Sequence, residues 1–330
     1  MKPTLASQNP SPSNLVFLKE NISKDYKTNV LDGLRSKQKM LPAWYLYDER
    51  GSDLFNSISK TTAYYPTRTE QEIYLRYAKD IAEVIGKNVS LIELGPGDMS
   101  KVRLLLDDIE PTNYIGIDVS EKELFNQGAC LARENPWLNV IGLCGDFSTG
   151  LIKKMSKYID NDSRRIIFYP GSTIGNIEPA EAVSFLRVLK NTLGLNGMLM
   201  VGVDYCKDRK LLEKAYNDPE GYTEGFNLNL LVRLNREYSA NFNAKFFRHH
   251  AFFNEKQSRI EMHLVSKKDQ NIIVGEDTIK FRPGETIHTE SSYKYTDEAF
   301  VSMAKNGGFD CAKVFADTND WFGVYVLQPY

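Results

Sequence analysis

The feature that most constrains the fold is a regular alternation between short apolar runs and amphipathic stretches from Ser90 to Asp204. Five apolar runs of strand length are separated by segments whose apolar residues recur at helical spacing. Such an alternation requires crossover connections between parallel strands, and these connections place helices on both faces of the sheet. The C-terminal segment from Thr296 adds a helical pattern and two strand-like runs. We therefore predict an α/β fold with a mostly parallel sheet that two further strands close.

The alternation breaks between residues 205 and 295, where two helical patterns precede strand-like runs. We interpret this segment as an inserted α+β substrate-binding domain, joined in space by an N-terminal portion that begins with a helical pattern over 14–39. The predicted organisation is a disordered tail over 1–13, a substrate-binding domain of 14–66 with 205–295, and a sheet domain of 67–204 with 296–330.

Composition excludes several classes of function. The formal charge is -2 with a sequence pI near 6.2, which provides no basic surface for nucleic acid or an acidic membrane. The N-terminus lacks the continuous apolar core of a signal peptide, and no run has the roughly 20 apolar residues of a membrane helix. The 4 cysteines and 4 histidines show no metal-ligand spacing, so we expect free thiols and no metal. A cytoplasmic monomer is expected.

Glycines and acids follow the first three predicted strands. Gly95 and Gly97 come after the first strand, where they let the backbone turn tightly and approach a ligand. Asp118 ends the second strand, where a carboxylate can accept both hydroxyls of a ribose, and Asp146 follows the third, where it can accept from an adenine amino group. Each residue alone is more often an ordinary turn or loop residue. Because ligands in open parallel sheets bind beyond the carboxyl ends of the strands, the three signals together favour an adenosyl cofactor.

The choice between adenosyl cofactors depends on a third glycine. A dinucleotide fingerprint needs that glycine to bring a helix N-terminus to the pyrophosphate, but Ser100 occupies the position here. S-adenosylmethionine (SAM) has no phosphate and does not require it. The sequence therefore favours SAM as the cofactor.

Longer motifs carry a resemblance to a known family. YDERGSDLFNSISKTTAYYPTRTE, ELGPGDMSKVRLLL, GSTIGNIEPAEA, AYNDPEGYTEGFNLNLLVRLNRE, IEMHLVS and TESSYKY occur in this order. Together they resemble the histidine-specific α-N-methyltransferases, which form hercynine in ergothioneine biosynthesis. The resemblance covers roughly residues 30–330 and implies a class I methyltransferase fold with a Rossmann-like sheet. Fungal enzymes that methylate a prenylated tryptophan are relatives, so membership alone leaves the substrate open.

The resemblance also implies roles for individual residues. It implies cofactor contacts by Gly95, Lys101, Asp118, Asp146 and Phe147. It implies that Asn176 and Tyr216 hold the substrate carboxylate, that Tyr64, Glu290 and Ser292 hold the imidazole, that Met262 forms part of the pocket wall, and that Tyr47 lies near the amino nitrogen as the catalytic residue.

The chemistry of Glu290 and Ser292 suits histidine. Glu290 can accept from an imidazole N–H, and Ser292 can donate to or accept from the other ring nitrogen. An indole has one N–H and no acceptor nitrogen, so it would leave one buried partner unpaired. We therefore expect methylation of the α-amino group of free L-histidine, with three transfers implied by the family. The alternatives are a methyltransferase for another free amino acid, such as a tryptophan derivative, and a non-catalytic SAM-binding protein.

Overall fold

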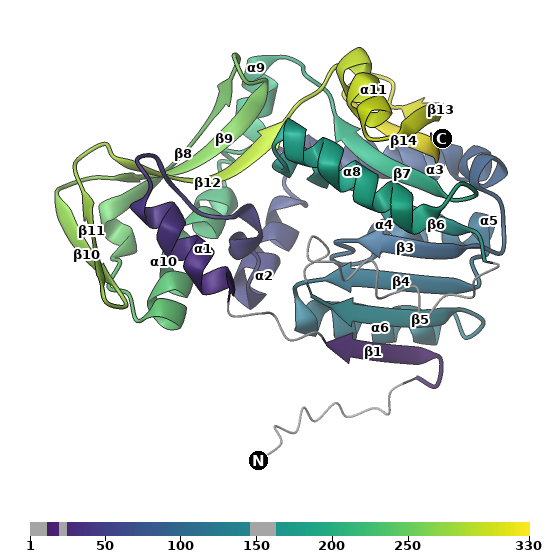
Figure 1. Ribbon diagram of the computed structural model, residues 1–330, viewed down its shortest axis with the longest axis horizontal. Coiled ribbons are helices and arrows are strands. Elements are labelled where there is room, and N and C mark those ends of the chain that lie inside the picture. The colour runs from purple at the N-terminus through teal and green to yellow at the C-terminus, as the bar shows by residue number, and fades with distance from the viewer. Residues whose placement is uncertain (1–11, 20–24, 146–162) are drawn as a thin grey trace.

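A mostly parallel sheet of eight strands forms the larger part of the computed structural model, which describes residues 12–19, 25–145 and 163–330 (Figure 1). The first six strands in the sheet order run parallel to one another. The seventh strand is antiparallel to both of its neighbours, the sixth and the eighth. This arrangement confirms the predicted α/β class and the closing hairpin. The order is β1 (Leu15–Lys19), β5 (Asn139–Cys144), β4 (Asn113–Asp118), β3 (Ser90–Leu94), β6 (Arg165–Tyr169), β7 (Met198–Asp204), β14 (Phe322–Pro329) and β13 (Phe309–Ala316).

Helices cover both faces of this sheet (Figure 1). On one face lie α8 (Pro179–Leu193) and α11 (Asp297–Asn306), whose buried residues pack with Ile92, Ile115 and Ile167. The strands are buried on both faces, as expected for a doubly covered parallel sheet. The opposite face carries α3 (Tyr65–Ile85), α4 (Ser100–Arg103), α5 (Leu106–Ile109) and α6 (Glu121–Glu134).

The smaller part of the molecule has its own core. A four-stranded sheet in the order β2 (Lys39–Met40), β12 (Thr286–Tyr293), β9 (Arg259–Ser266) and β8 (Phe247–Asn254) packs against helices. The N-terminal segment 30–65 shares this core with residues 211–287. The remaining elements are α1 (Asp25–Arg35), η1 (Ala43–Leu46), α2 (Glu49–Ile58), α9 (Arg209–Ala215), α10 (Tyr222–Tyr238), η5 (Ala244–Phe246) and the hairpin of β10 (Gln270–Val274) with β11 (Asp277–Phe281).

The prediction of one helix over 14–39 was wrong. Leu15–Lys19 form β1, which pairs in parallel with β5 at the edge of the large sheet, and the helix begins only at Asp25. The Asn14 amide donates to the backbone carbonyls of Ala132 (3.0 Å) and Leu138 (2.8 Å), which anchors the start of the strand. We propose to assign β1 to the sheet domain, since its register partners all lie in β5.

The helical pattern after the glycine loop is also interrupted. The predicted helix over 100–109 is two short helices, because residues 104 and 105 form a turn between them. The other predicted elements of the sheet domain are present, and β8 and β10 are strands that the sequence patterns did not reveal. None of the helices among the described residues is long and apolar enough to span a membrane.

The two parts meet at the carboxyl ends of the parallel strands. Tyr205, just after β7, forms a parallel bridge with Tyr295, just after β12. The short helix η4 (Thr173–Asn176), which follows β6, packs on the end of β12. A Cβ atom on Gly175 would lie only 2.7 Å from the backbone oxygen of Tyr293, so this approach requires glycine.

We predict that Gly175→Ala destabilises the protein by about 1–3 kcal/mol, because the added methyl forces η4 away from β12. Gly225→Ala in α10 is the matched control. Its new Cβ would lie 3.5 Å from a Leu54 side-chain carbon, an ordinary contact, so the higher helix propensity of alanine should raise stability by up to about 1 kcal/mol. Urea unfolding of both variants measures the difference. Equal stability of the two variants would contradict the proposed close packing at Gly175.

Candidate active site

The glycine loop after β3 leaves room for a ligand. Gly95 and Gly97 have φ of 68° and 53°, the left-handed region that glycine adopts without strain. A Cβ built on either residue meets no atom within 4 Å. The glycines are therefore required by the backbone turn, and the space beside them is open.

Asp118 ends β4 next to this loop. Its carboxylate accepts a hydrogen bond from the backbone N–H of Ser120 at 2.9 Å, and the Gly97 N–H also points to it. Burial raises the pKa of the Asp118 carboxyl above its usual value, while these N–H groups act in the opposite direction. A carboxylate held by the glycine loop at a strand end matches the ribose-binding position that the sequence predicted. Asp146 and Phe147 lie outside the described residues.

Lys101 is held by a buried acid that the sequence analysis did not single out. Its Nζ lies 2.5 Å from Oε2 of Glu70, whose side chain is fully buried in α3. Glu70 also accepts from the Tyr74 hydroxyl at 2.8 Å and from the Gly171 backbone N–H at 2.9 Å. The pair thus connects α3, α4 and the segment after β6. The Lys101 ammonium is positioned beside the glycine loop by this acid.

A second buried acid lies beneath the same loop. Glu93 accepts from the Tyr114 hydroxyl at 2.7 Å through Oε2, and its Oε1 has no hydrogen-bond partner among the described residues. Burial raises the pKa of the Glu93 carboxyl to about 8. The unpaired Oε1 can donate a hydrogen bond when Glu93 is protonated and accept one when it is ionised, so the site fits a ligand with a polar group such as an ammonium or hydroxyl of SAM.

Aromatic side chains form the substrate side of the site. Tyr47 follows η1 and packs edge-on against Phe55 and Phe226, with ring centroids 5.5 and 5.3 Å apart. Phe55 also contacts Tyr64 at 6.0 Å, and Tyr64 contacts Tyr216 at 6.0 Å. The three tyrosines that the family resemblance singled out therefore lie in one cluster, although they come from three separate segments.

The polar residues of β12 complete this side. Tyr216 donates to Oγ of Ser292 at 2.8 Å. Glu290 pairs in register with Met262 on β9, and both are buried. Burial raises the pKa of the Glu290 carboxyl to about 7, while the positive charge of Lys294 acts to lower it. Asn176 ends η4, which packs on the end of β12 near this group.

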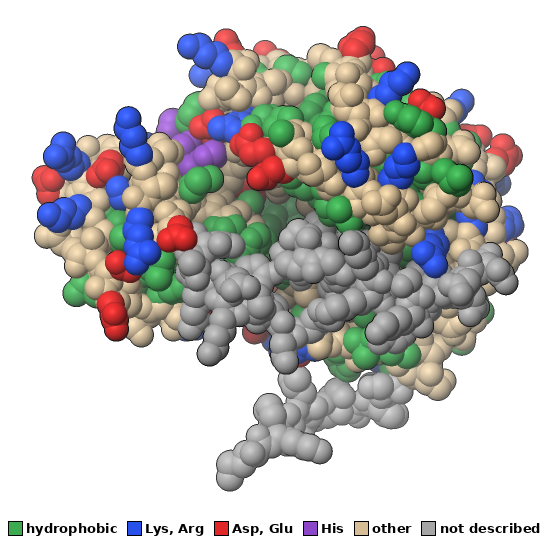
Figure 2. All heavy atoms as spheres, viewed as in Figure 1, with side chains coloured by type: hydrophobic (Ala, Val, Ile, Leu, Met, Phe, Trp, Pro, Cys, Tyr) green, Lys and Arg blue, Asp and Glu red, His purple; other side chains and the backbone are tan. Residues whose placement is uncertain are grey.

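The cofactor and substrate sides face each other at Tyr47. Burial is the main cause that raises the pKa of Tyr47, and the charges of Glu290 and Asp118 add to it. Both acids, Asp118 from the cofactor side and Glu290 from the substrate side, are thus near enough to act on the same phenol. Figure 2 shows the surface hollowed between the two parts of the molecule, with hydrophobic side chains along the hollow. The structure thus brings together the predicted residues that fall within its described segments.

A buried charge cluster lies under the substrate side and was missed from the sequence. Asp204, the last residue of β7, is fully buried and accepts from Lys294 Nζ at 2.7 Å, from Lys207 Nζ, and from the Tyr65 hydroxyl at 2.8 Å. Lys294 in turn donates to Ser292 Oγ at 2.8 Å and to the Tyr216 hydroxyl at 3.2 Å. One sequence signal could have identified Lys294. It follows the predicted ligand Ser292 by two positions, and residues i and i+2 lie on the same face of a strand.

Three potential metal ligands also gather, outside this site. Glu261, His263 and His288 offer ligand atoms within 4.8 Å of one another, and Figure 2 shows histidines together on the surface of the smaller part. The rings of His263 and His288 stack nearly parallel, with centroids 4.7 Å apart, so their nitrogen lone pairs do not converge on one point. Arg259 lies 2.8 Å from Glu261 and supplies the positive charge that a metal would bring. We therefore interpret Glu261, His263 and His288, with Arg259, as a cluster of packed polar side chains and not as a metal site.

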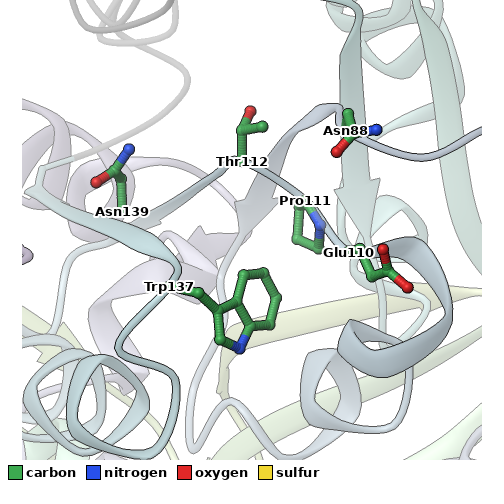
Figure 3. Close-up of a pocket in the computed structure, with 6 residues that line it drawn as sticks. All are labelled: Asn88, Glu110, Pro111, Thr112, Trp137 and Asn139. Carbon is green, nitrogen blue, oxygen red and sulfur yellow. The ribbon is translucent and has the colours of Figure 1, made fainter.

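A shallow hollow elsewhere is not part of the site. Figure 3 shows that Trp137 and Asn139 face Glu110, Pro111 and Thr112 across it, with Asn88 at its side. These residues lie at the amino ends of β4 and β5, whereas Asp118 ends β4 at the opposite edge of the sheet. Ligands of parallel sheets bind at the carboxyl ends, so this hollow is unrelated to the cofactor.

We predict that Lys101→Met destabilises the protein by about 3 kcal/mol, because Glu70 would keep a buried charge without its cation. The double variant Glu70→Gln/Lys101→Met should be less destabilised than Lys101→Met alone. Lys87→Met is the matched control, since the exposed Lys87–Glu110 pair should contribute less than about 1 kcal/mol. Chemical unfolding of the parent, Lys101→Met, Glu70→Gln and the double variant measures the coupling, and purely additive losses would exclude it.

Comparison with known proteins agrees with this geometry. The chain is 35% identical to a histidine N-alpha-methyltransferase of Mycolicibacterium smegmatis, over 92% of this chain and 95% of the relative. It is 33% identical to the enzyme of the same name from Mycobacterium tuberculosis, over 90% and 93% of the two chains. An L-tryptophan methyltransferase of Psilocybe serbica is 28% identical over 84% and 86%. Residues 26–329 match the profile of the SAM-dependent, histidine-specific methyltransferases, and the chain belongs to this family.

Proposed function

We propose that this enzyme transfers the methyl group of SAM to the α-amino nitrogen of free L-histidine, three times in succession, to give hercynine. The observation that carries the proposal is that Glu290 and Ser292 are both buried two positions apart on β12, hence on one face of the strand, with Met262 as the register partner of Glu290. A carboxylate and a hydroxyl can serve the two ring nitrogens of an imidazole at once. An indole would leave one of them unpaired, at a cost of about 1–3 kcal/mol or roughly 5- to 150-fold in affinity.

The remaining residues suit a free amino acid. Asn176 offers a neutral amide donor for the substrate carboxylate, and the Tyr216 hydroxyl, which donates to Ser292 here, would turn its hydrogen to the carboxylate when the substrate binds. The smaller part of the molecule, built from 25–66 and 205–295, would supply most of the pocket. Gly95, Lys101, Asp118, Asp146 and Phe147 would hold SAM, which supplies an electrophilic methyl group when bound. The protein's main task is then to align a neutral amine with that methyl, and alignment can supply on the order of 7–11 kcal/mol of the barrier.

Tyr47 is the residue we assign to the amine. Its raised pKa keeps the phenol protonated at neutral pH, so it cannot act as a phenolate base. It can instead accept a hydrogen bond from the amine through its oxygen and pass a proton along a hydrogen-bonded chain. Tyr47 would therefore orient the lone pair of the amine toward the methyl group.

We also propose that the enzyme works as a monomer in the cytoplasm. All 4 cysteines, Cys130, Cys144, Cys206 and Cys311, are free thiols, as is usual in a reducing compartment. Size-exclusion chromatography with light scattering tests the oligomeric state: a mass near 37.6 kDa supports the monomer, and twice that mass contradicts it.

The first prediction from this proposal concerns the substrate. With SAM present, L-histidine should gain up to three methyl groups, whereas histamine, which lacks the carboxylate that Asn176 and Tyr216 would hold, should react far more slowly. L-Tryptophan should also react at least about tenfold more slowly than L-histidine. Mass spectrometry of the products measures all three. Faster turnover of tryptophan would assign the enzyme to a different amino acid, and SAM binding without any methylated product would indicate a non-catalytic protein.

The second prediction concerns Tyr47. Tyr47→Phe removes the hydroxyl but keeps the ring packing, so kcat should fall by about 10²-fold or more while KM for histidine changes little. Tyr330→Phe, at an exposed residue near the C-terminus, is the matched control and should leave both constants unchanged. Steady-state kinetics with both variants provide the comparison. An unchanged kcat in Tyr47→Phe would remove this residue from the reaction.

A further inference from the structure

Lys294 is a buried cation in contact with the residues proposed to bind the imidazole. Its side chain is 1% exposed, and its backbone is held by hydrogen bonds with Ser258 in both directions. An ammonium has three hydrogens, and the three acceptors around Nζ are Asp204 at 2.7 Å, Ser292 Oγ at 2.8 Å and the Tyr216 hydroxyl at 3.2 Å. All three donors of Lys294 are therefore used inside the protein.

Lys294 is one of two lysines that share Asp204, and it is the one whose charge acts on Glu290. Asp204 is shared by two ammonium groups, since Lys207 binds it from the other side and also donates to the Tyr65 hydroxyl at 2.8 Å. The Asp317 carboxylate also acts on Lys207, whereas Lys294 is the cation whose charge acts on Glu290. Lys207 has no such effect on Glu290, although it shares the same aspartate.

Within the described segments, the other titratable side chains that act together with Glu290 are neutral phenols. The titratable groups that face it from neighbouring elements are Tyr47 after η1, Tyr64 before α3 and Tyr216 after α9. Burial raises the pKa of all three phenols, so they remain neutral. Lys294 is thus the positive charge available to stabilise a Glu290 carboxylate.

We infer that Lys294 is a positioning residue that keeps Glu290 ionised and orients the Ser292 hydroxyl, so that the pocket binds the neutral imidazole. The inference rests on the proposed histidine substrate. Ser292 Oγ accepts from both Tyr216 and Lys294, so its own hydrogen is free to point into the pocket. Glu290 then accepts the N–H of the ring while Ser292 donates to the lone pair of the other nitrogen. An imidazolium carries a hydrogen on both ring nitrogens, so its second N–H would point at the Ser292 hydrogen and could not accept it.

The test is the pH dependence of histidine binding. Calorimetric titration with S-adenosylhomocysteine present, between pH 6 and 9, should show binding in the unsubstituted enzyme that weakens below about pH 7, as Glu290 gains a proton. We call the pH at which the affinity for histidine has fallen to half of its high-pH value the pH of half-weakening. In Lys294→Met the Glu290 carboxylate loses its cation, so this pH should rise by about one unit. The affinity at pH 7 should then fall roughly five- to tenfold. Affinity should recover as the pH rises. A purely structural loss would not recover in this way.

Matched variants isolate the effect. Lys207→Met removes the other cation of Asp204 but touches neither Ser292 nor Tyr216, and its pH of half-weakening should equal that of the parent. In a Glu290→Gln background, Lys294→Met should produce no further shift. Because the imidazole of the ligand titrates identically in every experiment, differences between variants report on Glu290.

Each outcome is decisive. If the unsubstituted enzyme neither binds nor methylates histidine, the proposed substrate is wrong, whatever Lys294 does. If it binds histidine and Lys294→Met, folded as judged by S-adenosylhomocysteine binding, keeps the parental pH of half-weakening, the inference about Lys294 is overturned. If Lys294→Met does not fold, Lys294→Arg replaces it. That variant keeps the charge and should keep the parental pH dependence, and a shift of about one unit would overturn the inference.

Discussion

The arrangement of this enzyme depends on the buried carboxylate of Asp204 at the end of β7. It binds Lys207 from the same segment, Lys294 from the end of β12 and the Tyr65 hydroxyl from the start of α3. Its backbone N–H donates to Oγ of Ser172, which precedes η4. Four chain segments that are distant in sequence thus meet at one charge. Since removing one partner of a buried ion pair is strongly unfavourable, this charge fixes how the smaller part sits over the strand ends.

Buried acids paired with tyrosine hydroxyls recur through the molecule. Each phenol donates to a carboxylate without adding a charge, so the acid is satisfied while its pocket stays largely neutral. The buried pairs are Tyr74 with Glu70, Tyr114 with Glu93 and Tyr65 with Asp204. Tyr45 and Tyr293 donate in the same way to the exposed acids Glu237 and Glu178. Tyr216 differs, since it donates to Ser292 within the proposed substrate pocket.

Much of the fold was predictable because its signals are local. The parallel strands are apolar runs, and α11 begins at Asp297, directly after Thr296, where the sequence indicated a helical pattern. β1 was not predictable, because its side chains are only half covered and its pairing with β5 is a contact over more than a hundred residues. The residues of the site were predicted from sequence motifs. The acids that support them, Glu70 and Asp204, were not predicted, because nothing in their local sequence distinguishes a buried acid from a solvated one.

By itself, the sequence determined the class of fold, the cofactor and the family, because glycines and acids after successive apolar runs report on strand ends that any such sheet must place together. It also named the residues of the substrate pocket through longer motifs. Only the tertiary structure decided what surrounds those residues. Burial raises the pKa of Glu290, and the charge of Lys294 acts to lower it. Both effects come from segments that meet only after the chain has folded.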